Sequence, residues 1–230
     1  MENSYINPND MSIESNPLSH YLNDSELDLL NINSNQVEYS QRDTIIKQNS
    51  RSSHIIFIKS GLVKISKEMR KGKNLMLNIE GPGRFIGSSS VFGSDFYNYS
   101  VTALEPTIVS FIDTKIFKDI ITNNGTLGLE LISQISRSNI LMIDKLSSLL
   151  YKQLPGRVAD IIIYFSETIY KNDTFTFPLT RQELAELAGT TKESIIRTLS
   201  EFKHDKIIDI ERNTISILSP KIIQTLSRLG

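Results

Sequence analysis

Residues 36–113 carry their apolar side chains in short runs separated by polar residues, a spacing typical of β-strands. Clusters of glycine, proline, serine and lysine between the runs indicate tight turns. The runs are VEYS, TIIKQ, HIIFIKSG, LVKISKEM, LMLNIE, YSVTALE and TIVSFID, and the turn signals are Lys59-Ser60-Gly61, Arg70-Lys71-Gly72-Lys73 and Gly81-Pro82-Gly83. The pattern predicts an antiparallel β-barrel or jelly-roll-like sandwich in a domain that spans residues 18–125, within an α+β protein.

The segment before this β unit has two parts. Residues 1–17 are rich in Asn and Ser and lack periodicity, so we expect a flexible lead-in. From Pro17 to Leu30 the pattern becomes helical, with Leu27, Leu29 and Leu30 as its apolar positions. Ser25 is the expected N-cap of this helix.

A helical pattern covers residues 126–153 and carries its apolar residues on two stripes. One stripe has the spacing of a coiled-coil seam and includes an asparagine, a residue that fixes register in two-stranded coiled coils. Its members are Ile132, Ile135, Asn139, Met142, Leu146 and Leu149. Such a helix can cover its own domain with one stripe and pair with a second copy through the other, so we expect a parallel homodimer. A monomer in which one wide stripe faces the core also fits the spacing.

Leu154-Pro155-Gly156 interrupts this helix and begins a third region, residues 154–230. Within it, the stretch TRQELAELAGTTKESIIRTLSEF (180–202) holds two helical patterns that break at Gly189. Thr180 with Glu183 forms a capping box for the first helix, and Gly189 has the backbone freedom needed to end it. Thr190 or Thr191 is the expected cap of the second helix.

The second of these helices separates a core side from an outer side. At 100° per residue, Ile195, Leu199 and Phe202 fall together and are the expected core residues. The outer side carries residues that can contact base edges, namely Lys192, Glu193, Ile196, Arg197 and Ser200. With the hairpin pattern KIIDIERNTISIL, which turns near Arg212-Asn213, the region predicts a winged helix-turn-helix.

These segments resemble, in order and spacing, the cyclic-AMP receptor protein and FNR (CRP/FNR) superfamily of bacterial transcription regulators. The similar stretches are LTRQELAELAGTTKESIIRTLSEFKHDKII with TISIL, and upstream HIIFIKSGLVKIS, GPGRFIGSSSVFG and YSVTALEPTIVSFID. The resemblance covers most of the chain. It implies an effector domain joined to a DNA-binding domain, a homodimer on a palindromic double-stranded operator, and RNA polymerase as a partner, without a membrane.

The resemblance places base-reading positions on Lys192, Glu193 and Arg197, and puts Ile196 where family members vary. An arginine can bond both O6 and N7 of guanine, a glutamate can accept from cytosine, and an isoleucine can touch a thymine methyl group. Two interpretations without a role in base recognition also fit these residues. Glu193 can serve as the capping-box partner of Thr190, and an ordinary solvated helix face carries similar charges.

Charge alone does not indicate nucleic-acid binding. The net charge is −1, and the part from Tyr151 onward has 11 Lys/Arg against 10 Asp/Glu. Any DNA contact must therefore come from local placement of charge, with Arg181 and Thr191 as expected phosphate contacts. A helix-turn-helix that binds protein instead of DNA is the rival that this charge balance suggests.

Composition narrows the function classes further. A chain of 230 residues with 39% hydrophobic and 22% charged residues is long enough for two globular domains. The absence of cysteine excludes disulfides, thiolate zinc sites and a cysteine-ligated iron–sulfur cluster. The N-terminus shows no signal peptide, and no apolar run approaches the roughly 20 residues of a membrane span, so we expect a cytoplasmic protein.

The loop that holds the ligand in cyclic-AMP-binding relatives is altered here. FIGSSSVF places Ser88 and Ser89 where those relatives have a glutamate and its neighbour, and FYNYS places Asn98 and Tyr99 where they have an Arg-Ser pair. A buried phosphate would lack its charge-assisted partner. We therefore expect an effector other than cyclic AMP, or none. The candidate pocket comprises Gly87, Ser88, Ser89, Ser90, Asn98, Tyr99 and Met142. The helix positions that touch the purine in cyclic-AMP-binding relatives correspond to Met142 and Ile143, which are both apolar.

Two further alternatives concern the sensor domain. Haem occurs in this superfamily, and His20, His54 and Met142 are the conceivable axial ligands here, although a lone His near a strand is more often structural. A cupin-like metalloenzyme would need a close histidine pair. His20, His54 and His204 are dispersed, so we expect neither a metal site nor an enzyme.

Overall fold

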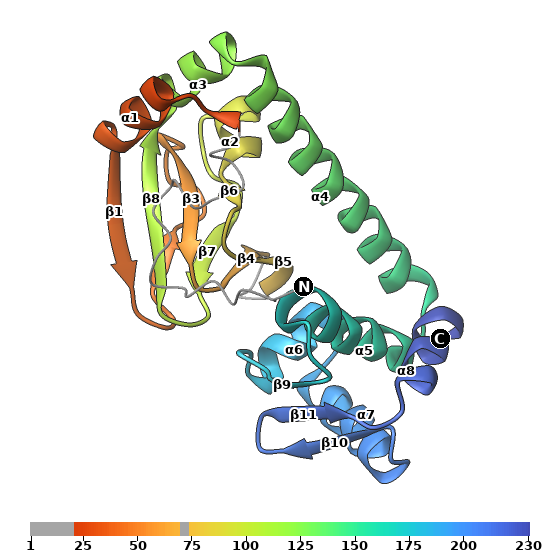
Figure 1. Cartoon of the computed structure of the whole chain (residues 1–230). Coiled ribbons are helices and arrows are strands. Elements are labelled where there is room, and N and C mark those ends of the chain that lie inside the picture. The colour runs from red at the N-terminus through yellow and green to blue at the C-terminus, as the bar shows by residue number, and fades with distance from the viewer. Residues whose placement is uncertain (1–20, 70–73) are drawn as a thin grey trace, which may run out of the picture. The chain divides into compact units, whose positions relative to one another are not determined.

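The computed structural model describes residues 21–69 and 74–230, which are coloured in Figure 1. The predicted flexible segment 1–17, His20 and the predicted turn at 70–73 lie outside the described residues. The described chain divides into two compact units, one of residues 21–69 with 78–139 and the other of 74–77 with 140–230. Among these residues, no helix is both long enough and apolar enough to cross a membrane.

Two antiparallel four-stranded sheets follow the first helix, with strand orders β1-β8-β3-β6 and β2-β7-β4-β5. In the first sheet Val37 lies opposite Val109, and Ile56 lies opposite Phe111. The strands are β1 (Ser34–Tyr39), β2 (Thr44–Ile46), β3 (His54–Ser60), β4 (Val63–Glu68), β5 (Asn74–Glu80), β6 (Phe85–Ile86), β7 (Ser100–Ala103) and β8 (Thr107–Asp113). The antiparallel prediction is confirmed, and the two sheets remain separate, as in a jelly roll, instead of closing into a barrel.

The first unit is built around β3, which is buried at four successive positions, Ile55 to Ile58. Side chains from the flanking helices complete this core, which includes Leu22, Leu30, Phe117, Ile120, Leu127 and Leu131. The rings of Phe57, Phe85 and Phe117 pack in series, tilted or edge-on to one another, with centroids 5.1 and 5.0 Å apart. Burial of this apolar surface holds the sheet against its helices.

Helix α1 (Asp24–Ile32) begins earlier than the sequence prediction. Asn23 is its N-cap, and a reciprocal capping box joins Asn23 to Glu26. Ser25 donates its hydroxyl to the Asn23 side chain and is not the cap. The prediction of Ser25 was wrong because Asn23, with a glutamate three residues later, satisfies two backbone donors reciprocally.

Two helices of this unit were not predicted. The short helix α2 (Ser88–Gly93) follows β6, and α3 (Thr114–Asn123) follows β8. Asp113 caps α3 by accepting hydrogen bonds from the backbone of Lys115 and Ile116 at 2.8 and 3.3 Å. The long predicted helix is α4 (Gly125–Tyr151), a continuous helix of 27 residues.

The second unit contains α5 (Leu154–Ile163), which has a proline in its first turn as expected, and the π-helix η5 (Tyr164–Tyr170). Its three-stranded sheet has the order β10-β11-β9. The buried ring of Phe165 packs against Phe175 and Phe177, with centroids 6.0 and 4.7 Å away. The remaining elements are β9 (Thr174–Thr176), α6 (Arg181–Ala188), α7 (Lys192–His204), β10 (Ile208–Glu211), β11 (Thr214–Ile217) and α8 (Pro220–Leu229). Helix α8 was not predicted.

Candidate nucleic-acid interface and effector site

Helices α6 and α7 are the two helices that the sequence predicts on either side of Gly189. The Glu183 carboxylate accepts a hydrogen bond from the Thr180 backbone at 2.7 Å, and Thr180 accepts one from the Glu183 backbone at 3.2 Å. The predicted capping box is therefore confirmed. Gly189 ends α6 in the left-handed conformation, with φ 62° and ψ 46°, which a glycine adopts at least cost.

Helix α7 has one buried face and one exposed face. Ile195, Leu199 and Phe202 are each at most 4% exposed. The exposed positions include every residue predicted on the outer side, namely Lys192, Glu193, Ile196, Arg197 and Ser200, and the adjacent Thr191 is exposed as well. The Ser200 hydroxyl donates to the carbonyl of Ile196 within the helix, at 2.8 Å.

The N-terminus of α7 resolves an alternative for Glu193. Thr191 is the cap, and its side chain accepts a hydrogen bond from the Ser194 backbone at 3.3 Å. Ser194 therefore occupies the third helical position, where a capping-box partner would stand. Glu193 is one position too early for that role, and its carboxylate lies on the exposed surface.

The predicted hairpin is formed by β10 and β11, with Ile208 opposite Ile217 and Glu211 opposite Thr214. Arg212 begins the turn with a left-handed φ of 57°. One Nη of Arg181 donates to the Arg212 carbonyl at 3.0 Å, and its other Nη is fully buried. Burial lowers the pKa of the Arg181 guanidinium. The side chain of Arg181, a predicted phosphate contact, is therefore hydrogen-bonded to the turn of the hairpin.

The turn between α6 and α7 is also contacted from behind. A methyl group of Leu149 lies 2.5 Å from the position that a Cβ on Gly189 would occupy. Arg157 of α5 donates to the Gly189 carbonyl at 3.4 Å. Leu149, expected on the dimer seam, thus packs within its own chain against the helix-turn-helix, a contact that sequence spacing could not reveal.

In the effector domain, the loop before α2 folds around one tyrosine. The Gly87 backbone donates to the Tyr99 hydroxyl at 3.1 Å, and Tyr99 is 8% exposed. Burial raises the pKa of Tyr99, and hydrogen bonding with Ser89 and Gly87 offsets part of that rise. Three of the predicted pocket residues therefore meet at this point.

Three other predicted pocket residues are not joined to this cluster by described contacts. Ser88 is half-buried, Asn98 is exposed, and Met142 belongs to the second compact unit.

Comparison with known proteins agrees with both halves of this architecture. Residues 36–124 match the family described as cyclic nucleotide-binding domain, and residues 156–226 match the Crp-like helix-turn-helix domain. The chain belongs to the CRP/FNR superfamily of transcription regulators. It is a regulator with a cyclic-nucleotide-binding-type domain and a DNA-binding helix-turn-helix, and not an enzyme.

Two curated relatives illustrate the membership. The chain is 23% identical over 185 residues to the CRP-like cAMP-activated global transcriptional regulator of Mycobacterium tuberculosis, covering 79% of this chain and 83% of the relative. It is 25% identical over 187 residues to the cAMP-activated global transcriptional regulator CRP of Salmonella typhimurium, covering 78% and 88%.

Solved structures share the fold. FixK2 from Bradyrhizobium japonicum superposes with a TM-score of 0.78 at 15% identity, covering 86% of this chain and 98% of FixK2. A putative transcriptional regulator of the crp/fnr family from Eubacterium rectale gives a TM-score of 0.75 at 20% identity, with coverage of 92% and 98%.

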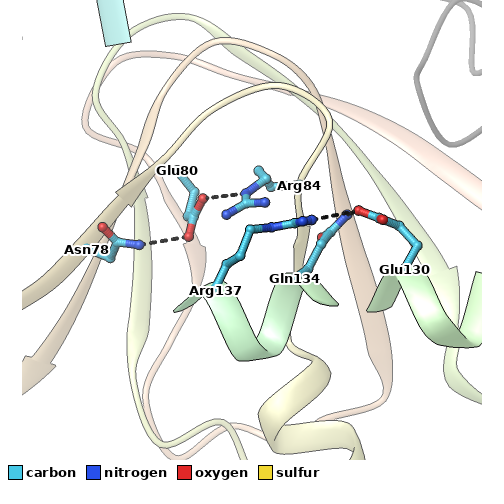
Figure 2. A network of polar contacts seen from close by, with 6 residues as sticks. All are labelled: Asn78, Glu80, Arg84, Glu130, Gln134 and Arg137. Atoms are coloured by element: carbon cyan, nitrogen blue, oxygen red, sulfur yellow. Dashed lines mark hydrogen bonds and ion pairs between the residues drawn. The ribbon is translucent and has the colours of Figure 1, made fainter. Parts of the chain in front are cut away.

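The effector domain of this CRP/FNR protein contains two arginines that sequence reasoning did not consider. Figure 2 shows that each meets a carboxylate: Arg84 contacts Glu80 at 3.0 Å, and Arg137 of α4 contacts Glu130 at 2.9 Å. Asn78 donates to Glu80 at 2.8 Å, and Gln134 donates to Glu130 at 3.3 Å. Each guanidinium therefore has an anionic partner among the described residues.

Of the residues considered for haem, His20 lies outside the described residues, and His54 makes local contacts. The Nδ1 atom of His54 lies 2.9 Å from the Ser53 hydroxyl, and its ring packs edge-on against Phe111 at 5.9 Å. These contacts explain His54 as a structural residue. Over residues 21–69 and 74–230, no three His, Cys, Asp or Glu side chains gather as they would around a metal ion.

The exposed apolar residues of helix α4 coincide only in part with the predicted seam. Ile132, Ile135 and Leu146 are 61%, 36% and 53% exposed, whereas Met142 and Leu149 are half-buried. A continuous three-and-four spacing of exposed positions runs through Leu129, Ile132, Ser136, Asn139, Ile143, Leu146 and Leu150. We call this set the exposed stripe. The predicted seam and the exposed stripe are both uninterrupted heptads through Asn139, so spacing alone could not decide between them.

Proposed function

We propose that this CRP/FNR regulator binds a palindromic operator as a homodimer, reads its sequence with α7, and responds to an effector other than cyclic AMP or to none. The division of α7 supports the proposal most directly. Its apolar face is fixed in the core of its own domain, while Lys192, Glu193 and Arg197 lie on the exposed surface. A helix anchored in this way can enter the major groove without exposing apolar core.

The exposed side chains have complementary chemistry for base edges. The Arg197 guanidinium can form two hydrogen bonds to a guanine, and the Glu193 carboxylate can accept from a cytosine amino group. Ile196, 43% exposed, offers a contact for a thymine methyl group. Lys192 adds a donor for base edges, and Thr191, at the helix N-terminus, can contact a phosphate, which the helix dipole also favours.

The exposed stripe supports a parallel homodimer. It carries five large apolar residues that are each more than half exposed, together with Asn139 at one seam position. A second copy of the same helix would bury these residues, and the asparagines would face each other and fix the register. A two-fold axis along the seam presents α7 twice, which requires an operator with matching half-sites.

The effector loop supports the exclusion of cyclic AMP. The Gly87 amide, which could serve a bound phosphate, already donates to Tyr99, and Asn98 supplies no positive charge. The two nearby arginines are paired with Glu80 and Glu130. A cyclic nucleotide would therefore lose the charge-assisted contacts that offset burial of its phosphate.

Operator recognition can be tested by selecting bound sequences from a random pool and measuring mobility shifts on the selected site. Arg197→Ala should cost about 1–3 kcal/mol per half-site and relax the preference at one guanine in each half. Arg228→Ala, at an exposed arginine of α8, is the matched control and should leave the preference intact. Unchanged discrimination by a folded Arg197→Ala protein would show that another residue reads the guanine.

The dimer can be tested by sedimentation. Ile132→Lys with Leu146→Lys should give monomers that no longer bind the operator, because four lysines would face one another across the seam. Both residues are exposed in the protomer, so its fold should survive. Leu141→Lys is the control, since Leu141 is 48% exposed but lies off the stripe. A dimeric double variant would refute this interface.

Cyclic-AMP binding can be tested by calorimetry on the full chain. We expect no heat of binding at micromolar cyclic AMP and no change in operator affinity. Micromolar binding that is lost in Tyr99→Ala would contradict the proposed exclusion.

A further inference from the structure

The wing of the DNA-binding unit is braced against the helix-turn-helix at its tip. The turn between β10 and β11 consists of Arg212 and Asn213, and both of their carbonyl oxygens accept hydrogen bonds from the segment that leads into α6. Arg181 donates to the Arg212 carbonyl at 3.0 Å, and the Phe177 backbone donates to the Asn213 carbonyl at 3.0 Å. The tip is therefore fixed to the start of the first helix.

A second brace holds the base of the hairpin. Lys203, near the C-terminus of α7, donates to the Ile210 carbonyl at 2.7 Å and pairs with Asp209 at 2.9 Å. On the other side of the hairpin, hydroxyl pairs join β9 to β11, Thr174 to Ser216 at 3.0 Å and Thr176 to Thr214 at 2.8 Å. Each brace connects the wing to an element of the helix-turn-helix or to the strand that precedes it.

The Arg181 side chain is oriented inward, toward this brace. One of its terminal nitrogens is bonded to the turn, and the other is fully buried without a hydrogen-bond partner among the described residues. A phosphate would need access to these nitrogens. Arg212, in contrast, is exposed, and its left-handed backbone is an uncommon conformation for a residue with a side chain, one that its surroundings must hold.

We propose that Arg181 is a positioning residue that holds the wing tip, and that Arg212 makes the backbone phosphate contact at this edge of the DNA-binding unit. In a helix-turn-helix the first helix crosses the DNA backbone while the second enters the groove. A wing tip bonded to the N-terminus of α6 therefore lies beside the backbone. The inference rests on the proposed operator binding, and it names Arg212 as the side chain that contacts a phosphate of the DNA backbone.

The two arginines can be separated by a double-mutant cycle. Wild type, Arg181→Met, Arg212→Gln and the double variant are titrated on the selected operator over a series of KCl concentrations. Each phosphate contact contributes about 0.9 to the slope of log affinity against log salt, so losing Arg212 from both protomers should lower the slope by about 2. Sequence discrimination should not change, because phosphate contacts carry no base information.

Arg181→Met should weaken binding and lower the slope in the wild-type background, because Arg212 is no longer held. In the Arg212→Gln background, Arg181→Met should change the affinity by less than about twofold, because the phosphate contact that Arg181 supports is already lost. The proposal would be overturned if the affinity losses of the two single variants multiplied in the double variant and their slope changes added, since Arg181 would then contact DNA itself. An Arg212→Gln protein with the wild-type slope would overturn it as well.

Two controls keep the result interpretable. Arg228→Gln removes the same charge at an exposed position on α8 and should retain the wild-type slope. If Arg181→Met fails to fold in thermal melting, Arg181→Gln replaces it in the cycle, with the same two outcomes. A wild-type protein that shows no salt-dependent operator binding would instead refute the proposed function, so the two failures are distinguishable.

Discussion

The buried ammonium group of Lys145 should make the stability of this protein depend on alkaline pH. Its Nζ donates to the carbonyl oxygens of Met76 and Leu77 at 2.7 and 3.2 Å. Burial lowers the pKa of Lys145 from 10.5 to about 8. The folded state therefore binds this proton less tightly than the unfolded chain does, and below pH 8 the buried charge is a full cost to folding.

The sign and size of the effect follow from proton linkage. Between pH 8 and 10.5 the unfolded chain holds the Lys145 proton and the folded chain has released it, so the free energy of unfolding rises with pH. At 1.36 kcal/mol per pKa unit, the full rise is about 3 kcal/mol. Because the two carbonyl oxygens also favour the charged form, this figure is an upper bound.

Urea denaturation followed by circular dichroism at pH 7, 8, 9 and 10 measures the rise. Tyrosines and other lysines titrate in the same range, so the quantity to compare is the difference between wild type and Lys145→Met. As the pH rises, the free energy of unfolding of wild type should increase relative to that of Lys145→Met. Lys221→Met, at an exposed position on α8, should show no such trend. A difference for Lys145→Met that stays constant from pH 7 to 10 would refute a titrating buried ammonium.

Three further substitutions test local features by urea denaturation. Gly189→Ala should cost about 1–2 kcal/mol from the left-handed backbone, with a further loss of operator affinity as the Leu149 methyl group is displaced; equal stability would mean that the turn relaxes freely. Thr180→Ala should cost about 0.5–2 kcal/mol because it removes the cap and one partner of buried Glu183, and Thr180→Ser should restore most of the loss. Tyr99→Phe leaves the Gly87 amide without its acceptor and should cost about 1–3 kcal/mol; unchanged hydrogen exchange at that amide would argue against the bond.

The recognition region could be predicted in detail because its signals are local. Gly189 has to end one helix, and the Thr180–Glu183 spacing has to begin it, whatever lies elsewhere in the chain. The 3.6-residue period then separates the buried side of α7 from the exposed side. The antiparallel strands followed from alternation and turn residues in the same way.

Several helix starts were missed although their signals were present. Asn23 with Glu26, and Asp113 before an apolar period, both begin helices in the way that Thr180 does. Ser219-Pro220 begins α8, and Gly230 follows its last helical residue. The inward orientation of Arg181 has no local signal, because it depends on a carbonyl 31 residues further along the chain.

At the end of α4, residues that contact the DNA-binding unit lie close in sequence to residues of the exposed stripe. Ser148 and Lys152 donate to the Asp160 carboxylate at 2.7 and 2.8 Å, and Ser227 of α8 donates to the same group at 2.6 Å. These bonds join the last turns of α4 to α5 and α8. Leu149, between them, packs on Gly189.

Leu146 and Leu150 of the exposed stripe lie within one helical turn of Leu149, about 60° and about 100° away from it around the same helix. A rotation of α4 about its axis would change the packing of these residues across the proposed dimer and would move Leu149 against the turn that precedes α7. Because Asp160 ties α4 to α5, the helix cannot rotate there without carrying its neighbours along. The last turns of α4 and the DNA-binding elements should therefore respond to a change in dimer packing as one mechanical unit.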